Sequence, residues 1–99
     1  MIVITGTIRI PADKLDEARP ALRALIEETR KEDGCLQYSF GQDLLDPGLL
    51  VAAEAWRDGA ALGAHLATPH FAAWREIGAE FGVSDVKLTV YEAVSSKPL

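Results

Sequence analysis

Cysteine is nearly absent from this chain of 99 residues and histidine is scarce, so several kinds of site are excluded. Cys35 is the only cysteine, which rules out an internal disulfide and a cysteine-based metal cluster. Two histidines without a cysteine pair argue against a structural zinc site. The chain also lacks a phosphate-binding glycine loop, a Gly-x-Ser-x-Gly motif and a nucleotide-binding fingerprint. We therefore expect neither a metal ion nor an organic cofactor.

Long apolar runs and basic clusters are lacking as well. No run approaches the roughly 18 apolar residues that span a bilayer. Residues 1–9 lack the basic start and the long apolar core of a signal peptide. The 15 acidic residues outnumber the 10 basic ones, giving a net charge of −5, and no basic face for neutralising phosphates is visible. We expect a cytoplasmic protein with no nucleic-acid and no membrane partner.

Alternating apolar and polar residues predict a first strand, which is followed by a helix. In residues 2–10 the four isoleucines fall on one side of an extended chain. Asp13 is predicted to cap a helix that runs to about Asp33. Pro20 is expected to kink this helix or to separate its first turn, since an interior proline removes a hydrogen bond. Gly34 is placed to end the helix in a left-handed conformation.

Three further strands are predicted by the same period of two. Residues 35–43 and 49–57 flank the turn sequence Asp46-Pro47-Gly48, so these two strands form a hairpin. Residues 86–91 alternate again and form the last strand.

Two helices are predicted between the hairpin and the last strand. Asp58 caps a short helix that ends near His65. Thr68 is an N-cap followed by Pro69 at the first helical position, and it opens a helix to about Phe81.

The major elements follow the order β-α-β-β-α-β, which is typical of a ferredoxin-like α+β fold with a split βαβ arrangement. Residues 1–99 are expected to form a single domain with an antiparallel sheet and helices on one face. The other sheet face, which includes Thr5 and Thr7, has no segment left to cover it. A second subunit is the simplest cover, so we expect a homodimer.

The two histidines are the first candidates for chemistry. His65, at the end of the short helix, suits a general base because an imidazole titrates near neutral pH. The structural alternative is a histidine that hydrogen-bonds the terminal carbonyls of its helix. His70 lies in the first turn of the next helix, where a neutral ring is favoured; it lines the same pocket or only packs beside Phe71.

Most aromatic residues are predicted to be core, and some could line a flat apolar cavity. Tyr38 and Trp56 are the first candidates for that lining, because each carries a polar group that needs a partner. The remaining aromatic candidates are Phe40, Phe71 and Trp74.

Two charged residues have open roles. Glu54 interrupts an apolar strand, and an ion pair with Arg9 or Arg75, within or between subunits, is the favoured interpretation. Arg75 either stabilises an oxyanion in the pocket or occupies a solvated helix position.

The most specific motif combines Glu54-x-Trp56 with the segment from Ala64 to His70, Ala-His-Leu-x-Thr-Pro-His. Together with Gly34-Cys35-Leu36-Gln37-Tyr38 and Asp46-Pro47, it resembles the antibiotic biosynthesis monooxygenase family, and within it the small quinol monooxygenases. The resemblance implies a dimeric α+β barrel made by pairing two sheets. It also implies oxidation of a small aromatic diol or an anthrone with O2 and no cofactor.

In that chemistry a base removes a phenolic or carbon-bound proton, and the resulting anion passes an electron to O2. The resemblance makes His65 the base, with Tyr38 or Trp56 orienting the substrate. The substrate would be bound by the remaining candidates, which are Phe40, His70, Phe71, Trp74 and Arg75.

Two departures and two alternatives accompany the resemblance. The chain contains no asparagine, and Trp74 and Arg75 stand where haem-degrading relatives are expected to carry an axial histidine, so haem degradation is disfavoured. Other relatives with a similar histidine motif isomerise small phosphorylated signalling sugars, which would require a phosphate grip from Arg9, Arg23, Arg57 or Arg75. A dimer that binds a small molecule without catalysis is the second alternative, since many functions share this fold.

Overall fold

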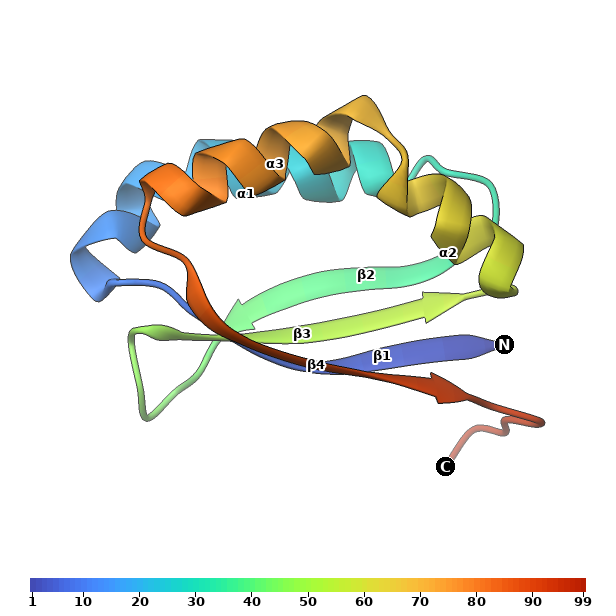
Figure 1. Cartoon of the computed structure of the whole chain (residues 1–99). Helices are drawn as coiled ribbons and strands as arrows, with labels where there is room; N and C mark the ends of the chain where they lie inside the picture. The colour runs from blue at the N-terminus through green and yellow to red at the C-terminus, as the bar shows by residue number, and fades with distance from the viewer.

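The computed structural model describes residues 1–99 as a four-stranded antiparallel sheet, in the order β2-β3-β1-β4, with helices on one face (Figure 1). The ferredoxin-like α+β prediction is confirmed, with the predicted short helix inserted before the second long one. The elements are β1 (Ile2–Arg9), α1 (Ala12–Thr29), β2 (Cys35–Gln42), β3 (Leu49–Trp56), α2 (Gly59–Leu66), α3 (Pro69–Glu80) and β4 (Ser84–Glu92).

Strand β1 occupies the middle of the sheet between β3 and β4, and its alternation is confirmed. Ile4 and Ile8 are buried beneath the helices, and so is Ile10 just beyond the strand. Gly6 has a φ of +155°, and a Cβ built at this position would meet the Lys87 carbonyl oxygen at 1.9 Å. Only glycine therefore allows β1 and β4 to approach this closely.

Helix α1 differs from its prediction at both ends. The Pro11 carbonyl accepts hydrogen bonds from the amides of Lys14 and Leu15, so the helix begins before Asp13, which caps nothing. Pro20 lies inside one continuous helix rather than separating a first turn. Buried side chains on both sides of Pro20 hold the helix against the sheet and compensate for the lost hydrogen bond: Leu15, Ala18, Leu22 and Leu25.

The second difference from the predicted helix lies at the end of α1, in the segment that leads to β2. The helix ends at Thr29 rather than near Asp33, and the next residues form tight turns closed by Lys31 and Glu32 amides. Gly34 has a φ of +82°, as its left-handed prediction requires, but it closes this turn and not the helix. Its bare α-carbon also lets the turn approach Ala61, whose Cβ would lie 2.6 Å from an added Cβ.

The two predicted N-caps on α2 and α3 are confirmed. The Asp58 carboxylate accepts a hydrogen bond from the Ala61 amide at 2.8 Å. The Thr68 hydroxyl accepts one from the Phe71 amide at 3.3 Å, and Pro69 is the first helical residue. These caps fix the junction that carries both histidines.

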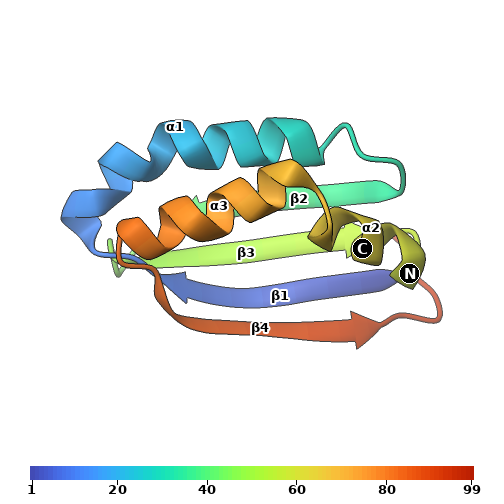
Figure 2. The same ribbon diagram turned by 45° about the horizontal axis from the view of Figure 1, so that its top comes forward.

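One face of the sheet is covered and the other is open (Figure 2). Helices α1 and α3 cover the first face, with Trp56 and Leu25 fully buried between the layers, whereas β4 lies at an uncovered edge. On the open face the strand register places Thr7 beside Val51 of β3 and Lys87 of β4. None of the helices combines the length and the apolar character that a membrane crossing needs.

Candidate active site

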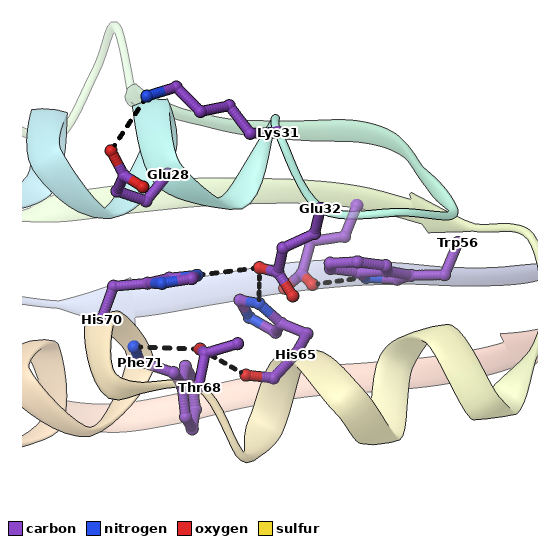
Figure 3. Close-up of polar contacts among 9 residues, drawn as sticks. Glu28, Lys31, Glu32, Trp56, His65, Thr68, His70 and Phe71 are labelled. Carbon is purple, nitrogen blue, oxygen red and sulfur yellow. Dashed lines mark hydrogen bonds and ion pairs between the residues drawn. The ribbon is translucent and has the colours of Figure 1, made fainter.

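Both histidines share one carboxylate oxygen in a cluster that joins three segments (Figure 3). Glu32 Oε2 lies 2.7 Å from His65 Nδ1 and 2.9 Å from His70 Nε2. Glu32 comes from the turn after α1, His65 from the last turn of α2, and His70 from the first turn of α3. An ionised carboxylate only accepts hydrogen bonds, so each ring donates from the nitrogen that faces Glu32. In this arrangement His65 carries its proton on Nδ1.

The same three side chains are the group that could hold a metal ion, since their ligand atoms lie within 4.8 Å of one another. Two imidazole nitrogens and one carboxylate oxygen are a donor set that divalent transition metals accept. Hydrogen bonding accounts for both short distances without an ion. The absence of a metal stays a prediction from the sequence.

A second buried hydrogen bond fixes Glu54. The indole Nε1 of Trp56 donates to Glu54 Oε1 at 3.0 Å, and both side chains point to the helix-covered face of β3. Glu54 is 7% exposed, and this burial raises the pKa of its carboxyl, although the Trp56 hydrogen bond and the nearby His65 oppose the rise. A carboxylate in this position keeps its proton to a higher pH than an exposed one.

The expected intrachain ion pair of Glu54 is wrong. Arg9 pairs instead with Asp46 at 2.9 Å, at the β2–β3 turn. Arg75 lies near the same cavity as Glu54 but forms no salt bridge with it. Strand β1 presents Arg9 to the open face and β3 presents Glu54 to the covered face, so the two side chains cannot meet.

Aromatic rings surround the buried imidazole of His65, which is 1% exposed. Its ring centroid lies 4.8 Å from that of Trp56, 5.1 Å from Phe71 and 5.2 Å from Tyr38. Phe40 packs edge-on against Tyr38 at 5.4 Å. Burial is the main cause that raises the pKa of the Tyr38 hydroxyl, with the Glu54 charge adding to it, so this hydroxyl stays neutral.

A cavity of about 310 Å³ lies between α3, the sheet and the uncovered strand β4. Nine of its twelve lining residues are hydrophobic, so the lining offers few hydrogen-bonding partners. The lining residues are Ile8, Tyr38, Phe40, Glu54, Phe71, Trp74, Arg75, Gly78, Ala79, Val83, Val86 and Leu88. Only two of them are acidic or basic residues, Glu54 with its carboxyl and Arg75 with its guanidinium.

Five of the eight predicted site residues line this cavity: Tyr38, Phe40, Phe71, Trp74 and Arg75. The other three do not. His65 is buried behind the Tyr38 and Phe71 rings, Trp56 is fully buried and hydrogen-bonds Glu54, and His70 hydrogen-bonds Glu32.

Sequence reasoning missed one residue of the site and misjudged another. Glu32 belongs to no motif, and no pattern in the sequence distinguishes it from its acidic neighbours. Glu54 belongs to the family-like motif Glu54-x-Trp56, but the sequence assigned its side chain only an ion-pair role. Its signal was present, because a carboxylate two residues before a tryptophan in an apolar strand shares the face of that tryptophan.

Comparison with known proteins agrees with this architecture. The family described as antibiotic biosynthesis monooxygenase matches residues 1–77. The chain belongs to this family.

Several relatives resemble the chain along most of its length. Rv0793 of Mycobacterium tuberculosis is 38% identical over 78 residues, which are 75% of this chain and 76% of Rv0793. YcnE of Bacillus subtilis is 31% identical over 71 residues, 72% of this chain and 75% of YcnE. Both bear provisional monooxygenase names.

Solved structures of the family superimpose closely. A protein of Deinococcus radiodurans with a provisional antibiotic biosynthesis monooxygenase name has a TM-score of 0.91 and 32% identity, covering 100% of this chain and 98% of that one. The Rv0793 structure gives a TM-score of 0.85 and 28% identity, covering 98% of both chains.

Proposed function

We propose that this protein is a cofactor-independent monooxygenase that oxidises a small aromatic diol or an anthrone with O2. The apolar cavity carries this proposal, because its walls are flat aromatic and aliphatic side chains with one carboxylate, one phenol and one guanidinium among them. Such a lining favours a flat, weakly polar molecule that offers one or two oxygen atoms for hydrogen bonding.

The chemistry requires a base, an apolar environment and a group that stabilises negative charge. Loss of a proton gives an electron-rich anion, which transfers one electron to O2, and the radical and superoxide then combine to a peroxide. The neutral Tyr38 hydroxyl and the Arg75 guanidinium line the cavity and are suited to bind the substrate oxygen as charge develops on it. A substrate that displaces water from the apolar lining would strengthen these interactions.

His65 is the base that the family resemblance implies. The Glu32 hydrogen bond supports a base role, since it leaves the lone pair of the imidazole on Nε2. The ring lies behind Tyr38 and Phe71, so its action on a substrate in the cavity requires those side chains to move or a second group to carry the proton.

The distribution of arginines favours an aromatic substrate over a phosphorylated sugar. Of the four arginines that could grip a phosphate, Arg9, Arg23 and Arg57 pair with acidic residues elsewhere on the surface. Arg75 alone lines the cavity. A single guanidinium in an apolar cavity matches a phenolate or an enolate better than a phosphate dianion.

A homodimer is part of the proposal. The open face of the sheet exposes Val51 and Tyr91 by 42% and 53% of their surface. Pairing this face with that of a second copy would bury both residues and complete a barrel.

Oxygen uptake by the metal-free protein tests the function. With a panel of reduced quinols and anthrones, at least one substrate should give saturable uptake above its autoxidation. Uptake no faster than autoxidation across the panel would contradict the proposal.

Two alanine-to-phenylalanine substitutions on α3 test whether the reaction uses this cavity. Both alanines are exposed, but Ala79→Phe places a ring at the cavity lining, whereas Ala73→Phe places the same ring at a position that does not line the cavity. Only Ala79→Phe should raise KM or abolish uptake. Equal kinetics of the two variants would place the reaction elsewhere.

A further inference from the structure

Glu54 is a buried carboxylate with no cationic partner, and it lines the cavity of the proposed function. Burying a carboxylate in an apolar wall costs free energy unless other groups compensate for the lost water. Its hydrogen bond from Trp56 engages only Oε1. The other oxygen, Oε2, accepts no side-chain hydrogen bond and is not sealed within the core, so it is free for a molecule in the cavity.

Trp56 holds this carboxylate in one orientation. The indole is fully buried, and its Nε1 has Glu54 as hydrogen-bond partner. Residues two apart on a strand share a face, so the backbone of β3 itself sets the spacing of the pair. The sequence suggested that Trp56 orients the substrate. In the structure, its indole instead orients the Glu54 carboxylate.

We propose that Glu54 is a catalytic residue, whose Oε2 takes the proton from the bound substrate. This inference rests on the proposed function and changes its base. Glu54 lines the cavity directly, whereas His65 lies behind Tyr38 and Phe71. Burial also raises the pKa of Glu54, which brings its basicity closer to that of a phenol or an anthrone carbon acid.

The proposed steps balance with O2 as the only co-reactant. For an anthrone, the C–H bond breaks, its proton goes to Glu54 and its electron pair stays on the ring as an enolate. The enolate gives one electron to O2, and the carbon radical and superoxide form a C–O bond. The peroxide anion recovers the proton from Glu54. Loss of water from the hydroperoxide then gives the quinone, with one oxygen atom in the product and one in water.

His65 acts in this scheme as a positioning residue. Its ring packs at a tilt against Trp56, which holds Glu54, and edge-on against Tyr38, which lines the cavity. The Glu32 hydrogen bond fixes His65 in turn. The imidazole therefore supports two groups at the cavity without touching the substrate.

Ring opening of 5-nitrobenzisoxazole tests the base without O2 and without the natural substrate. The probe is a flat, apolar carbon acid: a base takes its C–H proton, the N–O bond breaks, and a coloured cyanophenolate forms. The wild-type protein should accelerate this reaction over free acetate at the same pH by at least about tenfold. Glu54→Gln should lower the catalysed rate by about 10²-fold or more, a loss typical of a general base.

Two comparisons make the result specific. Glu80→Gln makes the same change at an exposed position of α3 and should leave the rate unchanged. His65→Ala should reduce the rate less than Glu54→Gln does, and the pH dependence that remains should be that of a carboxylate. Glutamine can still accept the Trp56 hydrogen bond, and circular dichroism checks that the variant folds.

Each outcome has one meaning. Catalysis that survives in Glu54→Gln, or that disappears only in His65→Ala, overturns the assignment of the base. A wild-type protein that binds the probe, as measured by tryptophan fluorescence, but does not accelerate its opening overturns it as well. Ring opening that depends on Glu54, without oxygen uptake on any quinol or anthrone, supports the base and contradicts only the oxygenase function.

Discussion

At the scale of single residues, the buried carboxyl of Glu54 reduces the free energy of unfolding when it is ionised. Its carboxyl is buried on β3, and burial raises its pKa from the ordinary value of 4.5. A raised pKa means that the folded state prefers the protonated carboxyl. The corresponding stability is fully present below the ordinary value and is lost as the pH rises through the pKa of the folded state.

Glu54→Gln should therefore become more stable than the wild type as the pH rises. Thermal unfolding at several pH values between 4 and 8 would measure this. The difference in Tm should be smallest at pH 4 and should grow towards neutral pH. The pKa values of Asp33, Asp46 and Asp58 are lowered by hydrogen bonds and cations, but these groups are common to both proteins and cancel. A difference that does not depend on pH would contradict the buried, ionised carboxyl.

Glu32 contacts both histidines through a single carboxylate oxygen, Oε2. Glu32→Ala removes the acceptor of the His65 Nδ1–H, which is buried, and should cost about 1–3 kcal/mol in the free energy of unfolding. Glu28→Ala is the matched control, since Glu28 lies one turn earlier and makes an exposed pair with Lys31 (Figure 3). The control should change stability by less than about 0.5 kcal/mol in urea unfolding. Equal effects of the two variants would show that the shared oxygen stabilises nothing.

At the scale of elements, local chemistry accounts for most of what the sequence predicted. Asp58 and Thr68 were correct as caps because an N-cap needs only the backbone amides two or three residues ahead. Asp13 was wrong because Pro11 already starts the helix, and the tertiary packing of α1 decides where the turn begins. The separate first turn, one of the two outcomes expected at Pro20, is absent for the same reason.

The close approach of β1 and β4 gives a prediction at this scale. Gly6→Ala should destabilise the protein by more than about 1 kcal/mol, because the new Cβ would collide with the Lys87 carbonyl and the backbone must separate. Gly41→Ala, on β2, meets nothing within 4 Å and is the matched control. Chemical unfolding compares the two. A Gly6→Ala protein as stable as the control would show that β4 can shift freely.

At the scale of the whole molecule, the parts of the site that the sequence could not reveal are contacts between distant segments. Glu32 meets His65 and His70 across 33 and 38 residues of sequence, and no local pattern encodes that meeting. The cavity likewise depends on how far α3 stands from β4. The motif containing His65 correctly indicated the family, whereas the carboxylate that lines the cavity is that of Glu54.

The open sheet face gives a prediction about assembly. Light scattering after size exclusion should give about twice the chain mass of 10.7 kDa. Val51→Lys, on the open face, should lower this mass towards that of one chain, because a charge would be buried between the sheets. Leu44→Lys, at a fully exposed turn, is the control and should leave the dimer intact. A wild-type monomer would contradict the proposed barrel.

Oxygen labelling tests the central claim most directly. Metal-free protein would convert an anthrone under ¹⁸O2 in ordinary water, and mass spectrometry would follow the quinone. Cofactor-independent monooxygenation predicts one ¹⁸O atom in each product molecule, formed at a rate that saturates with substrate and falls in Glu54→Gln. Product that carries no label, or that forms equally fast without the protein, would contradict it.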